Sequence, residues 1–231
     1  GIAAVAIIVV IACNIWGKGM VKIIPILLGV VASYVVGAIT GNVDFSKVHT
    51  VNLDEYLGLA PDHPQSYRYF MNTKLFDHIN VPKENTFVAS GVGDEVECVK
   101  EFRSILNRTH VDIQLLGIGE DGHIAFNEPG QVLHNNAHIE ALTESTIAAN
   151  ARFFADADAV PKKAISMGMG DIMRASKIIL IATGPKKADA IRGLIMNENV
   201  DVNNPSTMLK MHPDVTVIID RPLADLVGYT D

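Results

Sequence analysis

The chain has 231 residues, a formal net charge of −7 and two cysteines, Cys13 and Cys98. The acidic balance argues against a general nucleic-acid-binding protein, because phosphate backbones attract basic surfaces. Two cysteines without a CxxC motif argue against a disulfide-stapled scaffold and against a zinc ribbon. The length suffices for one sizeable α/β domain.

The beginning of the chain differs in composition from the rest. Residues 1–43 contain only two charged side chains, both lysines, and residues 23–40 form an uncharged, largely apolar run. A run of that length is typical of a transmembrane helix. We therefore expect an apolar, transmembrane-like segment over residues 1–43, with membrane association only if the run over 23–40 is a real span. From Asp44 onward charged residues become regular.

Residues 44–231 read as a second region in which short apolar runs alternate with helix-like segments. This alternation is typical of a mostly parallel sheet with helices on both faces. We therefore predict an α/β fold class, a three-layer αβα domain with a Rossmann-like sheet. The expected strands are 48–53, 111–119, 176–184 and 215–220, and the expected helices are 63–79, 94–109 and 185–196.

In open parallel sheets, ligands bind at the carboxyl ends of the strands, and one such end is rich in polar residues. Gly117–Gly122 matches the GxGxxG dinucleotide pattern, but Glu120 and Asp121 would place negative charge beside a pyrophosphate. We reject that interpretation. Asp121, His123 and Glu128 instead put two carboxylates near one imidazole, which suits proton transfer near neutral pH. On spacing alone, a loop histidine held by turn carboxylates explains the pattern equally well.

Three further residues are candidates for the site. Asp54 follows the first expected strand and suits a general base, although a solvated acidic turn also explains it. Lys187 begins a helix after a strand and a glycine, a place that suits a phosphate group, with an exposed lysine as the alternative. Arg152 stands among aromatic residues and fits either an anion ligand or a packing arginine. His134 and His138 lack an HExxH motif or a nearby cysteine, so we predict no metal site.

Several motifs together resemble the glucosamine-6-phosphate deaminases, collinearly from about Asp44 to near Asp220. The related 6-phosphogluconolactonases share the fold and a similar Gly-His loop, but they lack the combination of NLDEYLGL with HIAFNEP. The long GEDGHIAFNEP stretch makes a chance match a poor explanation. The motifs are NLDEYLGL (52–59), HPQSYRYFM (63–71), GIGEDGHIAFNEPG (117–130), NARFF (150–154) and TGPKKA (183–188).

The resemblance implies an enzyme without metal or cofactor, an isomerising hydrolase that converts glucosamine 6-phosphate into fructose 6-phosphate and ammonia. His123 would assist opening of the sugar ring, positioned by Asp121 and Glu128. Asp54 would move a proton between C2 and C1, as aldose–ketose isomerisation requires.

The same resemblance implies that Arg152 and Lys187 hold the substrate phosphate. It also implies a cytoplasmic enzyme domain whose partner is a small sugar phosphate, and homo-oligomerisation stays open. Allosterically activated members of the family usually carry basic residues in the region of residues 134–142. His138 and Glu140 stand there in this chain, which puts allosteric activation in doubt.

The amino-terminal segment departs from the family pattern. Residues 1–43 resemble part of a uracil/xanthine-type nucleobase permease. Residues 34–41 mimic the strand and phosphate loop with which the family begins, and we interpret that match as coincidental because the preceding run is membrane-like. We therefore expect an amino-terminally truncated deaminase over residues 44–231 with impaired activity. The alternatives are an inactive chimera with a membrane-anchored N-terminus, or a 6-phosphogluconolactonase-like sugar-phosphate hydrolase.

Overall fold

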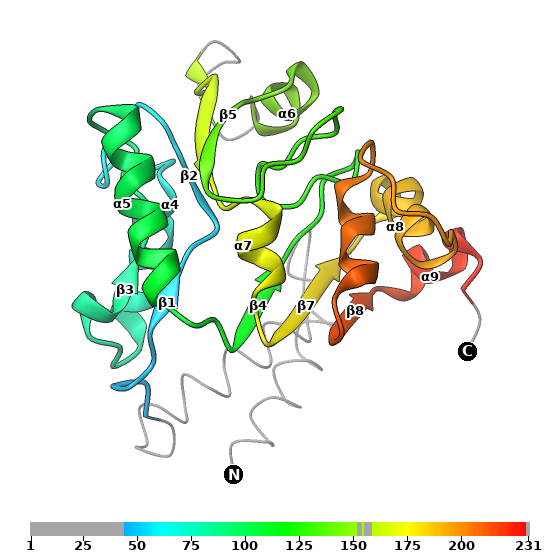
Figure 1. The fold of residues 1–231 in the computed structure, drawn as a ribbon, viewed down its shortest axis with the longest axis horizontal. Coiled ribbons are helices and arrows are strands. Elements are labelled where there is room, and N and C mark those ends of the chain that lie inside the picture. The colour runs from blue at the N-terminus through cyan, green and yellow to red at the C-terminus, as the bar shows by residue number, and fades with distance from the viewer. Residues whose placement is uncertain (1–43, 152–153, 155–158, 230–231) are drawn as a thin grey trace, which may run out of the picture. The chain divides into compact units, whose positions relative to one another are not determined.

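A computed structural model describes residues 44–151, 154 and 159–229 of the chain (Figure 1). Residues 1–43, which carry the expected membrane-like segment, and Arg152 lie outside these ranges. The chain divides into two compact units, which are taken one at a time below. In their described parts, the first comprises residues 44–51 and 69–87, and the second comprises residues 52–68 and 88–229.

The first unit is small and contains one pair of parallel strands, β1 (Thr50–Val51) and β3 (Thr86–Phe87). The side chain of Asn80 holds the first described residues, Asp44 and Phe45, in place. Its amide donates to Asp44 Oδ1 at 2.8 Å and its carbonyl accepts from Phe45 N at 2.8 Å. Most of helix α4 (Tyr67–Lys74) belongs to this unit, as do the 3₁₀ turns η1 (Phe76–His78) and η2 (Lys83–Asn85).

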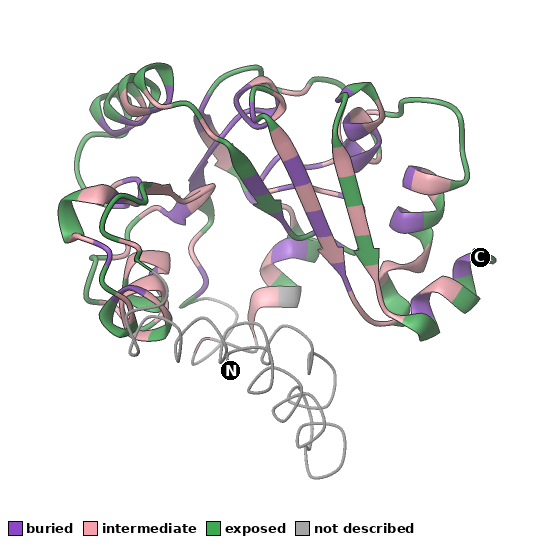
Figure 2. Ribbon diagram, turned by 90° about the horizontal axis from the view of Figure 1, so that it is seen from below, coloured by how far each residue is buried: buried purple, intermediate pink, exposed green. Residues whose placement is uncertain are grey.

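The second unit contains a parallel sheet with the order β4 (Ile113–Leu116), β7 (Lys177–Ala182) and β8 (Val215–Ile219). Alternate residues of β7 are buried, and Ile178 and Leu180 are fully so (Figure 2). On β4, Leu116 is buried while its neighbour Leu115 is exposed. Period-two burial of this kind shows that one face of the sheet packs against the core.

A second sheet in this unit is antiparallel, with the order β2 (Asp54–Tyr56), β6 (Lys163–Ser166) and β5 (His138–Ala141). The mostly parallel sheet expected from the sequence is therefore only part of the architecture. The expected strand over 48–53 is also wrong in its bounds, because only Thr50–Val51 form a strand there, and β2 begins after that region in a different sheet. Strands of three or four residues are too short for the alternation of apolar and polar residues to stand out in a sequence.

The helices of the second unit begin at recognisable caps. Helix α5 (Glu95–Arg108) begins after Asp94, whose Oδ1 accepts from the backbone N–H groups of Val96 and Glu97, both at 3.1 Å. Helix α9 (Arg221–Val227) ends at Gly228 in the left-handed conformation, with φ of +79°. The other helical segments are α6 (Glu144–Asn150), α7 (Met169–Met173), η5 (Pro185–Lys187), α8 (Ala188–Ile195) and η6 (Pro205–Met211).

The structure confirms the coarse prediction of a mixed α/β fold with parallel strands. The strands expected at 111–119, 176–184 and 215–220 correspond to β4, β7 and β8, and the helix expected at 94–109 corresponds to α5. Within the described ranges, no helix is long and apolar enough to cross a membrane. The run over residues 23–40 is not part of those ranges.

Candidate active site

The loop after β4 is closed by its own backbone. Gly119 N donates to His123 O at 2.8 Å, and Gly122 N donates to Gly119 O at 3.3 Å. Gly122 has φ of +90°, a conformation that side chains other than hydrogen rarely adopt. A Cβ atom on Gly119 would overlap His123 Nδ1 and Asp121 Oδ1. The glycines therefore let the imidazole and its carboxylate lie directly against the backbone of the loop.

The imidazole of His123 lies between two carboxylates. Its Nδ1 is 2.8 Å from Asp121 Oδ1 and 3.5 Å from Glu128 Oε2. The side chain of Glu128 is 3% exposed, whereas that of Asp121 is 32% exposed, so the two carboxylates have different environments. Both contact the same ring nitrogen, and this leaves Nε2 available for a reacting group. The structure thus brings together the three residues expected from the loop sequence.

The two carboxylates beside His123 have opposite electrostatic tendencies. Burial would raise the pKa of Asp121, but the hydrogen bond and charge of His123 outweigh burial and lower that pKa. Burial raises the pKa of Glu128, and the hydrogen bond from Thr146 Oγ1 at 2.7 Å offsets this only in part. Asp121 therefore favours the ionised form more than Glu128 does, and it is the carboxylate closer to Nδ1 of the ring.

Asp54 begins strand β2 and is partly buried. Burial raises its pKa from 3.8 to about 7, the charge of Glu55 adds to the rise, and the nearby His123 opposes it. Ser166 links Asp54 to the catalytic loop. It faces Asp54 in the register between β2 and β6, and its Oγ accepts from Phe126 N at 3.1 Å. The antiparallel sheet, which the sequence did not predict, is what brings Asp54 near His123.

Glu55 is a functional neighbour that the sequence interpretation treated only as half of an acidic pair. Its side chain is buried and accepts four hydrogen bonds of 2.8–3.0 Å. The donors are Tyr56 N, Ser66 Oγ, Tyr67 N and Arg68 N. Two of these belong to the first turn of α4, where the orphan N–H groups favour a negative charge. Glu55 therefore fixes strand β2, and with it the position of Asp54.

Four of the sequence motifs meet at one aromatic cluster. The ring of Tyr56 stacks on Tyr67 with centroids 5.4 Å apart, and it contacts Phe126 at 5.5 Å and Phe154 at 5.9 Å. These residues come from NLDEYLGL, HPQSYRYFM, HIAFNEP and NARFF respectively. The motifs that lie far apart in the sequence are thus parts of one packed unit behind β2.

The turn after β7 reaches the catalytic loop. Lys186 Nζ lies 3.3 Å from Glu120 Oε1, so the carboxyl ends of neighbouring strands β4 and β7 are bridged by an exposed ion pair. Lys187, the expected phosphate ligand, is half-buried in this turn, after Gly184 with φ of +90°. Arg152, the other expected phosphate ligand, is outside the described residues.

A second support of the loop is the 3₁₀ segment η6, which no sequence pattern predicted. Ser206 N donates to Gly122 O at 2.9 Å, and Ser206 Oγ donates to Asn204 Oδ1. Asn204 in turn donates to Ala190 O at 2.9 Å and packs against Gly122. Residues more than eighty positions further along the chain thus hold the turn that precedes His123.

Two groups of side chains in the described part of the chain have donor atoms that could share one metal ion. In each group the donor atoms lie within 4.8 Å of one another. The first is the acid–base cluster of Asp121, His123 and Glu128, and the second is formed by His134, His138 and Glu140. The sequence interpretation predicted no metal site at His134 and His138, and it did not connect Glu140 with them.

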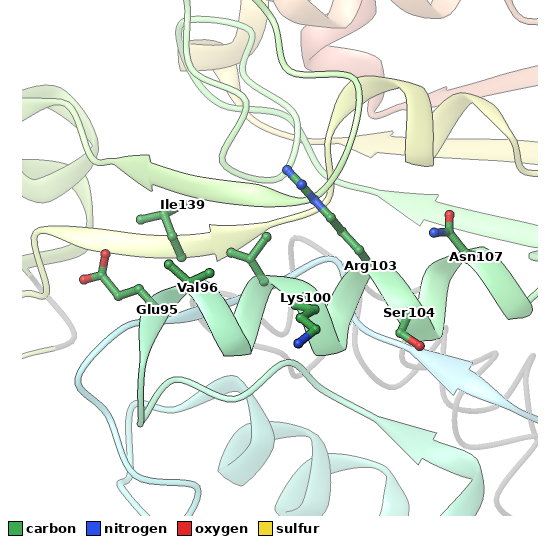
Figure 3. A pocket seen from close by; sticks show the side chains of 8 residues that line it. Glu95, Val96, Lys100, Arg103, Ser104, Asn107 and Ile139 are labelled. Atoms are coloured by element: carbon green, nitrogen blue, oxygen red, sulfur yellow. The ribbon is translucent and has the colours of Figure 1, made fainter.

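A surface groove of about 630 Å³ lies along α5 rather than at the catalytic loop (Figure 3). Its lining includes Glu95, Val96, Arg103 and, from β5, Ile139. None of the acid–base residues lines it. The groove is therefore not where the chemistry of His123 would take place.

Comparison with known proteins identifies the family. Residues 29–218 match the family described as glucosamine-6-phosphate isomerases/6-phosphogluconolactonase. The match begins inside the apolar segment, whereas we expected the domain boundary near residue 44. A protein of Clostridium perfringens named glucosamine-6-phosphate deaminase is 52% identical over 189 residues, which is 81% of this chain and 78% of that protein.

Solved structures agree with the sequence relatives. A monomeric glucosamine-6-phosphate deaminase has a TM-score of 0.81 and 36% identity, over 98% of this chain and 97% of that one. A 6-phosphogluconolactonase from Thermotoga maritima has a TM-score of 0.59 and 17% identity, over 76% of this chain and 73% of that one. At 17% identity this second likeness shows the fold alone. The chain belongs to the glucosamine-6-phosphate isomerase/6-phosphogluconolactonase family.

Proposed function

We propose that the chain acts as a glucosamine-6-phosphate deaminase, which converts glucosamine 6-phosphate and water into fructose 6-phosphate and ammonia. The relative with 52% identity carries that name, and so does the solved structure with 36% identity. The observation that carries the mechanism is the pair of proton-transfer groups. A strand carboxylate, Asp54, has its pKa raised to about 7 and lies near an imidazole held by Asp121.

His123 is suited to open the sugar ring. Asp121, whose pKa is lowered, places a carboxylate oxygen 2.8 Å from Nδ1 and so helps to orient the imidazole. The free Nε2 then takes the proton from the C1 hydroxyl and returns it to the ring oxygen as the C1–O5 bond breaks. Glu128 adds a second carboxylate beside Nδ1, and Thr146 fixes its orientation. The product of this step is the open-chain aldehyde.

Asp54 is suited to the isomerisation that follows. A carboxyl group with a pKa of about 7 is about half ionised at neutral pH, so it can both remove and return a proton. Its carboxylate removes the proton from C2 and delivers it to C1, while a second proton passes from the amino nitrogen to the C1 oxygen. The products of this step are a hydroxyl group on C1 and an imine at C2. Water then adds to C2 and ammonia leaves, so that fructose 6-phosphate is formed.

Binding of the substrate phosphate is assigned to Lys187 and Arg152 as a prediction. Lys187 follows a glycine at the carboxyl end of β7, in the turn whose neighbour Lys186 pairs with Glu120 of the catalytic loop. This location supports a phosphate position near His123, since a lysine at the start of a helical turn favours an anion. Arg152 rests on the family resemblance alone.

The test is ammonia release by the purified full chain with glucosamine 6-phosphate, with Asp54→Asn as the inactive control. Turnover by the wild type, lost in the variant, is expected. Hydrolysis of 6-phosphogluconolactone without ammonia release would instead favour the second candidate, a lactonase. That alternative is supported by the description of the family and by structural likeness at low identity. Turnover of neither compound would favour the inactive chimera.

The finer expectations for the whole chain remain predictions. They are the three-layer αβα arrangement, a cytoplasmic enzyme domain, homo-oligomerisation and the permease-like origin of residues 1–43. The family match from residue 29 includes the strand-and-loop pattern at 34–41, which weighs against a purely permease-like segment. A genomic read across codons 40–50 tests whether the two segments are joined in the gene. Carbonate extraction of membranes tests the predicted span at residues 23–40.

A further inference from the structure

A group of three side chains at the start of β5 is separate from the catalytic cluster. Ile139 lines the groove along α5 (Figure 3), so His138 and Glu140, one residue to either side, project from the opposite face of the strand. His138 Nε2 lies 3.0 Å from Glu140 Oε2. The ring of His134 stacks on that of His138 with centroids 4.1 Å apart. Donor atoms of all three residues lie within 4.8 Å of one another.

The contacts of the two ring nitrogens of His138 are compatible with a positive centre between His138 and Glu140. Its Nδ1 is 3.2 Å from the carbonyl oxygen of Asn136, and a carbonyl can only accept, so a hydrogen bond there needs the Nδ1–H tautomer. In the neutral ring the Nε2 lone pair would then face a carboxylate oxygen at 3.0 Å, which is repulsive. A proton or a metal ion on Nε2 removes the repulsion. An imidazole whose Nδ1–H is held by a backbone carbonyl is also the usual arrangement of a metal-bound histidine.

The loop that carries His134 is held in place by helix α7. Met169 N donates to His134 O at 2.7 Å, and Asp171 N donates to Asn135 O at 3.1 Å. Gly168 allows this approach, because a Cβ atom there would overlap the backbone of Asn135 and its neighbour. The backbone positions of the group are therefore set before any ion binds, and only the exposed His134 side chain needs to adjust.

We propose that His134, His138 and Glu140 form a binding site for a divalent transition-metal ion of the zinc type. Two imidazoles and one carboxylate are a donor set that suits Zn²⁺, Co²⁺ and Ni²⁺, and three protein ligands leave a fourth position for water. With bonds of about 2.0–2.1 Å, tetrahedral ligands are separated by about 3.3 Å. The observed separation of 3.0 Å between His138 Nε2 and Glu140 Oε2 is close to that value.

The proposed site lies in the same row of the antiparallel sheet as Asp54. Ser166 on β6 pairs with His138 on one side and with Asp54 on the other. Two inter-strand spacings correspond to about 10 Å, so the ion would not contact Asp54. Arg103, whose Nε donates to Ala137 O at 2.7 Å, is the neighbouring positive charge that opposes binding. We expect the ion to stabilise the β5 edge without being needed for turnover.

The test is titration of the full chain with Co²⁺, followed by visible absorption, and with Zn²⁺, followed by calorimetry. One equivalent with tetrahedral Co²⁺ bands and a rise in the melting temperature is expected. Two separate variants remove a ligand each: Glu140→Gln, which keeps the size of the side chain, and His138→Ala. Each should weaken binding by at least about 10-fold. His110→Ala, which removes an exposed histidine away from this loop, serves as the matched control and should bind as the wild type does.

Two results would overturn the proposal. One is the absence of stoichiometric binding, which would leave the group as a histidine hydrogen-bonded to Glu140. The other is loss of binding in His123→Ala with retention in Glu140→Gln, which would move the ion to the catalytic cluster. Because ammonia release is measured separately, failure of metal binding is distinguishable from failure of the proposed activity.

Discussion

Replacement of Asp54 by asparagine tests the electrostatic environment of the base directly. Burial and the charge of Glu55 raise the pKa of Asp54 from 3.8 to about 7. At 1.36 kcal/mol per pH unit, this difference amounts to about 4 kcal/mol as an upper value. Partial solvent access reduces the cost, so we expect about 2–4 kcal/mol of instability from the ionised carboxylate in the folded protein.

The size of the stability difference between Asp54→Asn and the wild type depends on pH. Between pH 3.8 and about 7 the folded state keeps the Asp54 proton while the unfolded state has lost it. The stabilising contribution of the protonated form is therefore fully present below pH 3.8 and is lost as pH rises through about 7. Asparagine imitates the neutral acid at every pH. Asp54→Asn should match the wild type in stability near pH 4 and exceed it by about 2–4 kcal/mol at pH 8.

Urea unfolding at pH 4, 6 and 8 measures this difference, and ammonia release at the same pH values shows the loss of turnover. Asp44→Asn is a suitable control, because hydrogen bonds from Ser46 lower the pKa of the exposed Asp44 carboxyl. That variant should gain no stability at high pH. A constant gap between Asp54→Asn and the wild type across all three pH values would refute the reasoning. So would a wild type that is the more stable protein at pH 8.

Three further changes test the surroundings of the site. Glu55→Gln should lower the free energy of unfolding by about 2–4 kcal/mol in urea titrations, because an amide cannot accept all four hydrogen bonds of the buried carboxylate; an unchanged midpoint would contradict its positioning role. Gly119→Ala should lower kcat at least about 100-fold in steady-state assays, because the added Cβ would displace His123 from Asp121. A variant with the kcat of the wild type would show that this contact is not needed. Lys187→Gln should raise KM for glucosamine 6-phosphate more than it lowers kcat, whereas an unchanged KM would remove Lys187 from the phosphate site.

The acid–base loop could be predicted from the sequence because its parts are local. Asp121, His123 and Glu128 lie within one short loop, and a turn rich in glycine brings them close to one another. The same is true of β4, β7 and β8, whose apolar runs are long enough to be recognised. Local features of this kind depend mainly on residues that are neighbours in the chain.

The position of Asp54 could not be predicted in the same way. It depends on the pairing of β2 with β6, whose contacts join residues more than a hundred positions apart. The roles of Glu55 and Ser166 also exist only after those strands have paired. The contact between His138 and Glu140 could not be predicted either, because it depends on strand β5, which the sequence did not indicate.

The carboxyl groups of the site have environments that assign different tasks to them. The hydrogen bond and charge of His123 lower the pKa of Asp121, which favours the ionised form of that carboxyl group beside the imidazole. Burial raises the pKa of Asp54, which makes that group a base able to release its proton near neutral pH. In many enzymes, two nearby carboxyl groups whose pKa values are shifted in opposite directions have different roles in proton transfer. In the proposed reaction, the loop would therefore supply the ring-opening imidazole, and strand β2 would supply the base for the C2–C1 proton transfer.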